Sequence, residues 1–172
     1  MNLSRRIYAV LLISTGLWCL AIVLTPILRV VGGEAGATMA NACYRGFSRI
    51  CHQLDERSLH LLGAKFGVCI RCTAIYFSFF FGVIVYPFVR SLRTKETPDM
   101  RWLFAAIAPM VLDALFNDLG IFRSGELSRV ITGSVGGFVL AFFIVPLFID
   151  AITQILIHRT SQGETHYAGQ TQ

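Results

Sequence analysis

Four long apolar stretches, almost free of charge, constrain the fold of this chain more than any other feature. They cover residues 7–28, 66–89, 102–122 and 130–149. The first and the fourth contain no charged residue, the second contains only Arg71, and the third contains Asp113 and Asp118. A helix of about 20 apolar residues crosses the hydrocarbon layer of a membrane. Each stretch is therefore long enough to span it.

The composition supports a membrane protein. Hydrophobic residues make up 55% of the 172 residues and charged residues only 15%, which is more apolar material than a soluble core of this length needs. Membrane-spanning strands would instead give short segments of alternating hydrophobicity. We therefore expect an all-α membrane protein with four transmembrane helices in a bundle. It forms a single domain over residues 1–160, followed by a disordered polar tail over residues 161–172.

Basic residues that flank the four stretches predict the orientation. Their numbers are nearly equal on the two sides of the bilayer, but residues 90–101 hold four of them in one short loop. Such density favours the cytoplasmic side. We expect the cytoplasmic (inner) membrane of a bacterium or archaeon, with both termini in the cytoplasm. The first stretch is too long for a secretory signal, so we expect it to stay uncleaved.

The net charge of +5 does not by itself indicate a nucleic-acid partner. The basic residues flank the helices and are not interleaved with exposed aromatic residues, so anionic lipid headgroups are the nearer partner. The expected partners are membrane lipids and a small ligand or metal ion, without nucleic acid. Whether the protein forms a homo-oligomer stays open.

Cysteine and histidine residues gather where a polar segment meets the second apolar stretch. They are Cys51, His52, Cys69 and Cys72. Thiolates and imidazoles bind soft metals, and thiols also carry out redox exchange. These residues therefore predict a site at the mouth of a membrane helix.

Three interpretations of the thiols stay open. In the first, zinc or another soft metal is bound by a Cys3His set, which consists of Cys51, Cys69, Cys72 and either His52 or His60. In the second, Cys69 and Cys72 are a redox pair at a helix N-terminus, where the helix dipole and the intervening arginine lower a thiol pKa. In the third, the thiols are structural, as disulfides or as buried side chains.

Charged residues form a second candidate site. Asp113 lies eleven residues past Trp102, which places it about 16 Å into the layer. A charge at that depth costs about 2.5–3.5 kcal/mol on insertion scales, so it needs a partner or water. Arg71 is the natural partner of Asp113 or of Asp118, and such a pair either serves a ligand or only joins the second helix to the third.

A chain with four spans places its first and third loops on the same side of the membrane, so these charges converge near the thiols. The candidate ligand-binding residues are Arg71, Asp113, Asp118, Arg123 and Arg129. Arginines at helix ends also commonly reach out to lipid headgroups, and this is the alternative for Arg123 and Arg129.

Two patterns concern packing. Apolar residues recur at helical spacing through the first loop, from Phe47 to Leu62, and predict an amphipathic segment that lies on the membrane surface. In a regular helix Cys51 and His52 point about 100° apart, so joint ligation would need a break there. In the fourth stretch, Gly133 and Gly137 stand four apart and allow another helix to approach closely.

Several motifs resemble those of a known family. They are Cys-His-Gln at residues 51–53, Glu-Arg-Ser at 56–58 and Cys-Ile-Arg-Cys-Thr-Ala-Ile-Tyr at 69–76, followed by Asp113, Arg-Ser at 123–124, Arg129 and Thr-Gly at 132–133. The pattern is similar to an uncharacterised family of small prokaryotic multi-pass membrane proteins, classed as a domain of unknown function. The resemblance covers roughly residues 51–137 and implies that these positions form a shared site. It implies no activity, and Asn117 stands where the family has glutamine.

A looser resemblance is to the quinone-linked thiol oxidases of the bacterial inner membrane. These four-helix proteins carry a Cys-x-x-Cys near the start of the second helix, as Cys69 and Cys72 do here, and the resemblance implies a quinone cofactor. They also carry a cysteine pair between the third and fourth helices, where residues 121–128 contain none. Cys43 and Cys51 would have to take its place.

The sequence thus predicts an integral inner-membrane protein with a Cys/His site at the extracytoplasmic face. The expected role is to bind or move a small ligand, either a soft metal ion or a lipid phosphate held by the arginines. The alternatives are a thiol–disulfide oxidoreductase that uses Cys69 and Cys72, and a structural or partner-binding membrane subunit. The residues leave open whether the protein is an enzyme.

Overall fold

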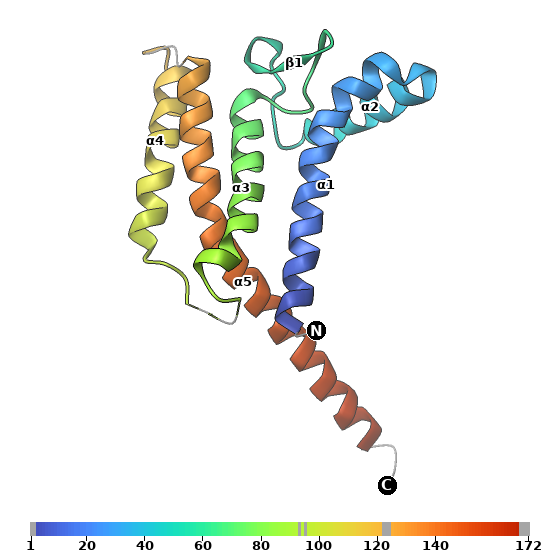
Figure 1. The fold of residues 1–172 in the computed structure, drawn as a ribbon, viewed down its shortest axis with the longest axis vertical. Helices are drawn as coiled ribbons and strands as arrows, with labels where there is room; N and C mark the ends of the chain where they lie inside the picture. The colour runs from blue at the N-terminus through green and yellow to red at the C-terminus, as the bar shows by residue number, and fades with distance from the viewer. Residues whose placement is uncertain (1–2, 93, 95, 122–124, 169–172) are drawn as a thin grey trace.

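Four long helices lie side by side in the computed structural model, which describes residues 3–92, 94, 96–121 and 125–168, with side chains as far as His158. They are α1 (Leu3–Val31), α3 (Ile70–Val89), α4 (Met100–Asp118) and α5 (Glu126–Ala168). Figure 1 shows them in the spatial order α4, α5, α3, α1, so that α4 and α1 lie at opposite ends of the row. Arg123 and Ser124 lie outside the described residues.

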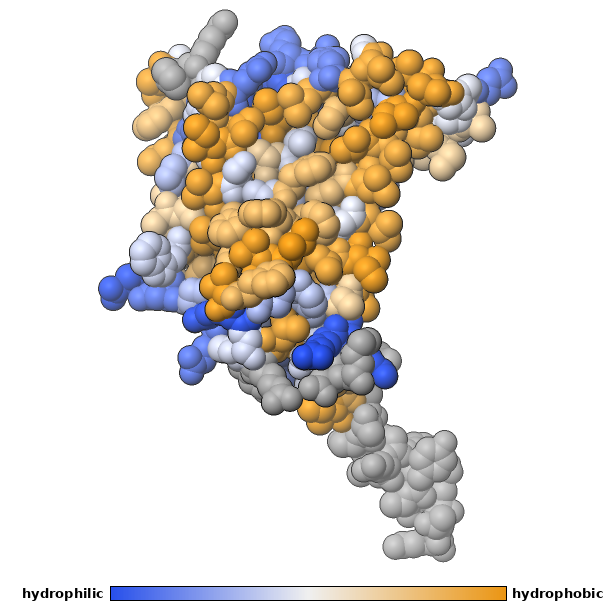
Figure 2. Space-filling model, in the orientation of Figure 1, coloured by the Kyte–Doolittle hydropathy of each residue, from blue (hydrophilic) through white to orange (hydrophobic). Residues whose placement is uncertain are grey.

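The helices confirm the expected membrane class. Among the described residues, these four are long and apolar enough to cross a bilayer. Figure 2 shows hydrophobic residues over the middle of one face and hydrophilic residues gathered at its two ends, which is the surface that a hydrocarbon layer with two polar boundaries requires. The disordered tail over residues 161–172 stays a prediction.

The third span ends four residues earlier than the apolar stretch does. Helix α4 ends at Asp118, and Gly120 follows with a φ of 71°. The Ile121 N–H donates to the Phe116 carbonyl at 3.0 Å and the Gly120 N–H to the Asn117 carbonyl at 3.2 Å. This pair of bonds is a Schellman motif, which satisfies carbonyls that the helix end leaves without a partner.

Close packing of α3 against α5 forms the centre of the molecule. A Cβ atom at Gly137 would lie 2.3 Å from the Ile75 carbonyl oxygen, and one at Gly133 would lie 2.9 Å from the Arg71 carbonyl oxygen. The glycines therefore let α5 lie against the backbone of α3, in agreement with their predicted packing role. In contrast, α4 packs chiefly against α5.

The connection between α1 and α3 differs from the predicted amphipathic segment. Its main helix is α2 (Gly33–Phe47), which ends where the predicted segment begins. A short 3-10 helix η1 (Asp55–Arg57) and an antiparallel hairpin of β1 (His60–Leu61) and β2 (Ala64–Lys65) follow. Leu62 and Gly63 both have positive φ in the two-residue turn, a geometry that reverses the chain into a hairpin. The prediction of helical structure from Phe47 to Leu62 is therefore wrong.

Candidate functional site

Three cysteine side chains meet where α3 begins. The Sγ atoms of Cys51, Cys69 and Cys72 all lie within 4.8 Å of one another. Cys69 is the N-cap residue of α3, Cys72 lies in its first turn, and Cys51 comes from the irregular segment that follows α2. Cys51 is buried and the other two are half-buried. We call this group the thiol wall.

Backbone hydrogen bonds fix the position of Cys51. Its Sγ accepts from the Cys69 N–H at 3.2 Å and from the Gln53 N–H at 3.5 Å. The thiol of Cys69, together with that of Cys72 and these N–H groups, lowers the pKa of the Cys51 thiol, because hydrogen bonds to a thiolate favour the charged form. Thiolate is the form that binds metals and attacks disulfides.

Gln53 holds the segment that carries Cys51. Its side-chain amide donates to the Tyr44 carbonyl at 2.9 Å and to the Gly67 carbonyl at 2.7 Å, while its own carbonyl accepts from Lys65 Nζ at 3.0 Å. Its φ is 49°, which is uncommon for a residue other than glycine. These bonds join α2, the hairpin and the start of α3. Gln53 therefore holds the thiols in position, and its side chain is not part of the thiol wall.

The other predicted ligands lie apart from the sulfur atoms. His52 is exposed and its ring nitrogens do not belong to the group of atoms within 4.8 Å. The ring of His60 pairs with Asp55 instead, at 3.4 Å. Cys43 packs against the buried cluster that contains Cys51 but is not in the sulfur group either. None of the five cysteines, all within the described part of the chain, forms a disulfide.

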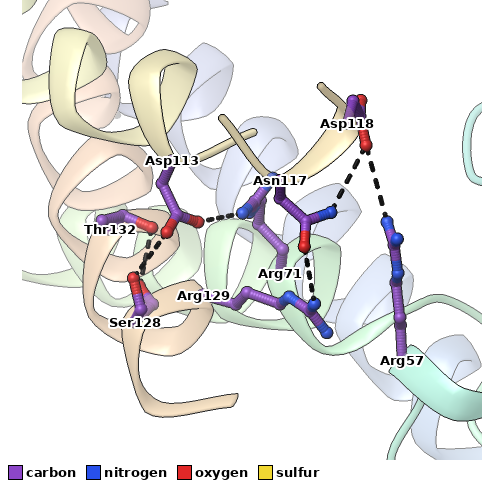
Figure 3. A network of polar contacts seen from close by, with 8 residues as sticks. All are labelled: Arg57, Arg71, Asp113, Asn117, Asp118, Ser128, Arg129 and Thr132. Carbon is purple, nitrogen blue, oxygen red and sulfur yellow. Dashed lines mark hydrogen bonds and ion pairs between the residues drawn. The ribbon is translucent and has the colours of Figure 1, made fainter. Parts of the chain in front are cut away.

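A second group of candidate residues forms a charged network, which Figure 3 shows. Arg71 forms an ion pair with Asp113, whose other carboxylate oxygen accepts from Ser128 Oγ at 2.7 Å. The side chains of Arg71 and Asp113 are 20% and 9% exposed. This is one of the two pairings that the sequence offered for Arg71, and it joins α3, α4 and α5.

The network continues toward the first loop. Arg129 donates to the side-chain oxygen of Asn117 at 3.5 Å, and the Asn117 amide donates to Asp118 at 3.4 Å. Arg57 lies 3.8 Å from the carboxylate of Asp118. We call the set of charged residues the charged wall, which consists of Arg57, Arg71, Asp113, Asp118 and Arg129. Arg123, which was also predicted to belong here, lies outside the described residues.

A cavity of about 410 Å³ separates the two walls. All three cysteines of the thiol wall border it, and so do His52 and four members of the charged wall, which are Arg57, Arg71, Arg129 and Asp118. Ile50, Leu54 and Ile70 supply apolar surface. The predicted thiols therefore face one space together with three of the predicted charged residues, Arg71, Asp118 and Arg129, while Asp113 lies behind Arg71 and does not border the cavity.

Sequence reasoning did not assign a site role to Gln53, Arg57 or Ser128. Gln53 and Arg57 stand inside the motifs that carry the family resemblance, so the motifs contained a signal for them. Ser128 had none, because a serine near a helix start usually caps that helix. Here its hydroxyl instead donates to a carboxylate on the neighbouring helix.

Comparisons with known proteins agree with this architecture. The family described as "Predicted membrane protein (DUF2085)" matches residues 51–143, a range that contains the whole thiol wall and the whole charged wall. The chain is 33% identical over 150 residues to "Uncharacterized protein MJ1492" of Methanocaldococcus jannaschii, which covers 86% of this chain and 96% of that protein.

A second relative is an "Uncharacterized protein" of Methanothermobacter thermautotrophicus. It is 32% identical over 99 residues, which are 58% of this chain and 86% of that protein. No solved structure gives a significant match. Since the family match covers more than half of the chain and includes the motifs that pointed to it, the chain belongs to the DUF2085 family of predicted membrane proteins.

Proposed function

We propose that this membrane protein binds a soft metal ion, such as zinc, through Cys51, Cys69 and Cys72. The observation that carries the proposal is the mutual approach of their three Sγ atoms to within 4.8 Å. Sulfur atoms bound to one tetrahedral zinc at about 2.3 Å lie about 3.8 Å apart. The thiols need to close by no more than about 1 Å to share an ion.

The first loop supports such a site. Cys51 and Cys69 are joined by a hydrogen bond from backbone to sulfur, and Gln53 fixes the segment between α2 and the hairpin. Small shifts of the half-buried Cys69 and Cys72 side chains would suffice for ligation. Apolar residues around Cys51, including Ile22, Phe47 and Val68, shield it from water, which strengthens bonds between an ion and its ligands.

The fourth ligand would come from the cavity. His52 borders that cavity, and rotation of its exposed side chain is the simplest way to complete the Cys3His set. A water or a ligand molecule could occupy the position instead. Zinc sites with three protein ligands and one open position are a common catalytic arrangement. A site of this kind could therefore hold the ion as a structural centre or present it to a ligand.

Metal analysis of cysteine variants tests the proposal. Protein purified without reductant or chelator should contain near-stoichiometric zinc or another soft metal, and Cys69→Ser and Cys72→Ser should each lose most of it, because tetrahedral sites rarely keep high affinity without one thiolate. Cys43→Ser and Cys19→Ser are matched controls and should keep the metal. Equal metal content in all four variants would contradict the proposal.

Thiol–disulfide exchange is a second candidate, and one observation favours it. An apolar cavity of about 450 Å³ between α1, α3 and α5 is lined by Tyr76, which lies one helical turn beyond Cys72, and by Cys19. A quinone is a suitable occupant. Oxidation of the Cys69 and Cys72 thiols to a disulfide would release two electrons and two protons, which reduce the quinone to a quinol. Quinone-dependent formation of this disulfide in protein that lacks metal would replace the first proposal.

The orientation belongs to the same proposal, with the thiol wall on the extracytoplasmic side of the cell membrane. The basic density of residues 90–101 supports it. In a cysteine-free variant, single cysteines at Gly33 and Gly125 should react with an impermeant thiol reagent in whole cells, and one at Thr94 should not. Labelling at Thr94 alone would reverse the orientation.

A further inference from the structure

We propose that the cavity between the two walls receives the phosphate group of a membrane lipid, and that one chain of this lipid lies in an apolar groove between α3 and α5. The inference goes beyond the metal site and does not need an ion. The phosphate group belongs to a lipid, and free inorganic phosphate is the alternative that the experiments below distinguish from it.

The charges in the cavity favour an anion. Three guanidinium groups border it, of which Arg57 pairs with Asp118 and Arg71 pairs with Asp113. Within the described part of the chain, Arg129 has no carboxylate partner and donates only to the neutral side chain of Asn117. The buried Nε of Arg71 has no hydrogen-bond partner there either. Guanidinium groups bind phosphate oxygens in a bidentate manner.

A groove along the membrane-spanning helices adjoins the cavity. This groove, of about 370 Å³, lies between α3 and α5 and has mostly apolar walls, with Thr73, Ser78 and Ser134 among its lining residues. Ile70 borders both the cavity and the groove, and Val130 of the groove follows directly after Arg129 of the cavity. A molecule with its anionic end in the cavity can therefore extend an apolar tail into the groove.

The length of the groove fits one leaflet of a bilayer. Its α3 side runs from Ile70 to Phe81, and eleven residues of helix rise about 16 Å. Half of the hydrocarbon core of a bilayer is about 15 Å thick. Because Ile70 is also the first residue of α3, the cavity lies at the level where lipid phosphates lie and the groove lies where their chains lie. A free phosphate has no apolar chain and would leave the groove unfilled.

Lipid retention by the full-length protein tests this inference. The protein, purified in detergent and verified to be folded, is incubated with phosphatidic acid or with a diacylglycerol that has the same chains, and bound lipid is counted by native mass spectrometry. We expect phosphatidic acid to be retained about tenfold better, because a hydrogen bond to a charged group is worth about one decade of affinity or more. A chelator-treated sample should give the same result, which separates this inference from the metal proposal.

Two variants address the two ends of the lipid. Arg129→Gln should reduce retention of phosphatidic acid about tenfold, and Arg101→Gln is its control, because Arg101 is exposed and pairs with Asp99 outside the cavity. Ser134→Leu should fill the groove and also reduce retention. Val135→Leu is its control, since Val135 is 47% exposed and does not line the groove.

Three results would overturn the inference. Equal retention of phosphatidic acid and diacylglycerol would exclude a phosphate site, and retention that Arg129→Gln leaves unchanged would place the lipid elsewhere. Competition by inorganic phosphate at similar affinity, with Ser134→Leu harmless, would show that the cavity takes free phosphate and that the groove has no part in binding. Protein that is purified without any metal but still retains phosphatidic acid would leave the inference intact and count against the metal proposal alone.

Discussion

The thiol wall and the charged wall face the same cavity but are held in place by different means. The thiol wall comes from one segment of chain, residues 51–72, and backbone N–H groups fix Cys51 within it. The charged wall is assembled from the first loop, α3, α4 and α5, and only side-chain contacts join its members. The thiols are therefore arranged locally, whereas the charges depend on how the helices pack. Disturbing one wall should leave the other largely in place.

The largest expected effect is on stability, from removal of one partner of the ion pair in the charged wall. Asp113→Asn should destabilise the protein by about 3–5 kcal/mol, because Arg71 keeps its charge in a largely buried place. Denaturant titration of the protein in detergent measures this change in the free energy of unfolding. The double variant Arg71→Gln with Asp113→Asn should recover part of the loss, and metal content should not change.

Asp99→Asn is the matched control for that prediction. Asp99 caps α4 at the opposite end and is 57% exposed, and asparagine is an equally good capping residue. A stable Asp113→Asn protein that fails to bind phosphatidic acid would contradict a structural ion pair. It would show that Asp113 is needed for ligand binding.

A smaller effect is expected from the helix contact that supports both walls. In Gly137→Ala the new methyl group would lie 2.3 Å from the Ile75 carbonyl oxygen, so α3 and α5 must separate at a cost of about 1–3 kcal/mol. Gly136→Ala is the control, since its nearest neighbour would lie at 3.8 Å. Its stability should be unchanged or slightly higher, because alanine favours helix. Equal melting temperatures for the two variants would refute the close approach of α3 to α5.

The smallest effect on global stability is expected in the first loop. Gln53→Ala removes two hydrogen bonds, at a cost of about 1–2 kcal/mol. The Gly67 carbonyl loses its side-chain donor, whereas the Tyr44 carbonyl keeps its bond from the Ser48 N–H at 2.9 Å. Since Gln53 orients a ligand segment, metal affinity should fall about 10- to 100-fold, as a competition titration with a chelator measures. Ser58→Ala, whose exposed hydroxyl bonds within the same loop, should bind metal normally. Unchanged affinity in Gln53→Ala would show that the thiol wall needs no such support.

The sequence predicted the helices because their signal is local. Twenty consecutive apolar residues identify a span whatever their neighbours are, and all four spans occur where expected. The Cys-x-x-Cys spacing likewise placed Cys69 and Cys72 together at the start of α3, one turn apart. The meeting of Cys51 with them follows from the path of the first loop, for which spacing gives no direct signal.

The first loop was harder to predict because its apolar residues do not follow one helix. Leu59, Leu61 and Leu62 have spacing that fits a helix in part, but the positive φ of Leu62 and Gly63 forms a hairpin turn. The pairing of Arg71 was limited to two carboxylates by topology. Choosing Asp113 required the packing of α4 on α5, which no pattern in the sequence specifies.

The central claim is that three thiolates hold one metal ion, and X-ray absorption spectroscopy at the metal edge tests it most directly. For zinc in the full-length protein, purified without reductant or chelator, we expect three sulfur neighbours at about 2.3 Å and one nitrogen or oxygen neighbour at about 2.0–2.1 Å. In Cys43→Ser the spectrum should not change, because Cys43 is not in the sulfur group. Protein that contains no metal, or a bound metal with only nitrogen and oxygen neighbours, would contradict the account.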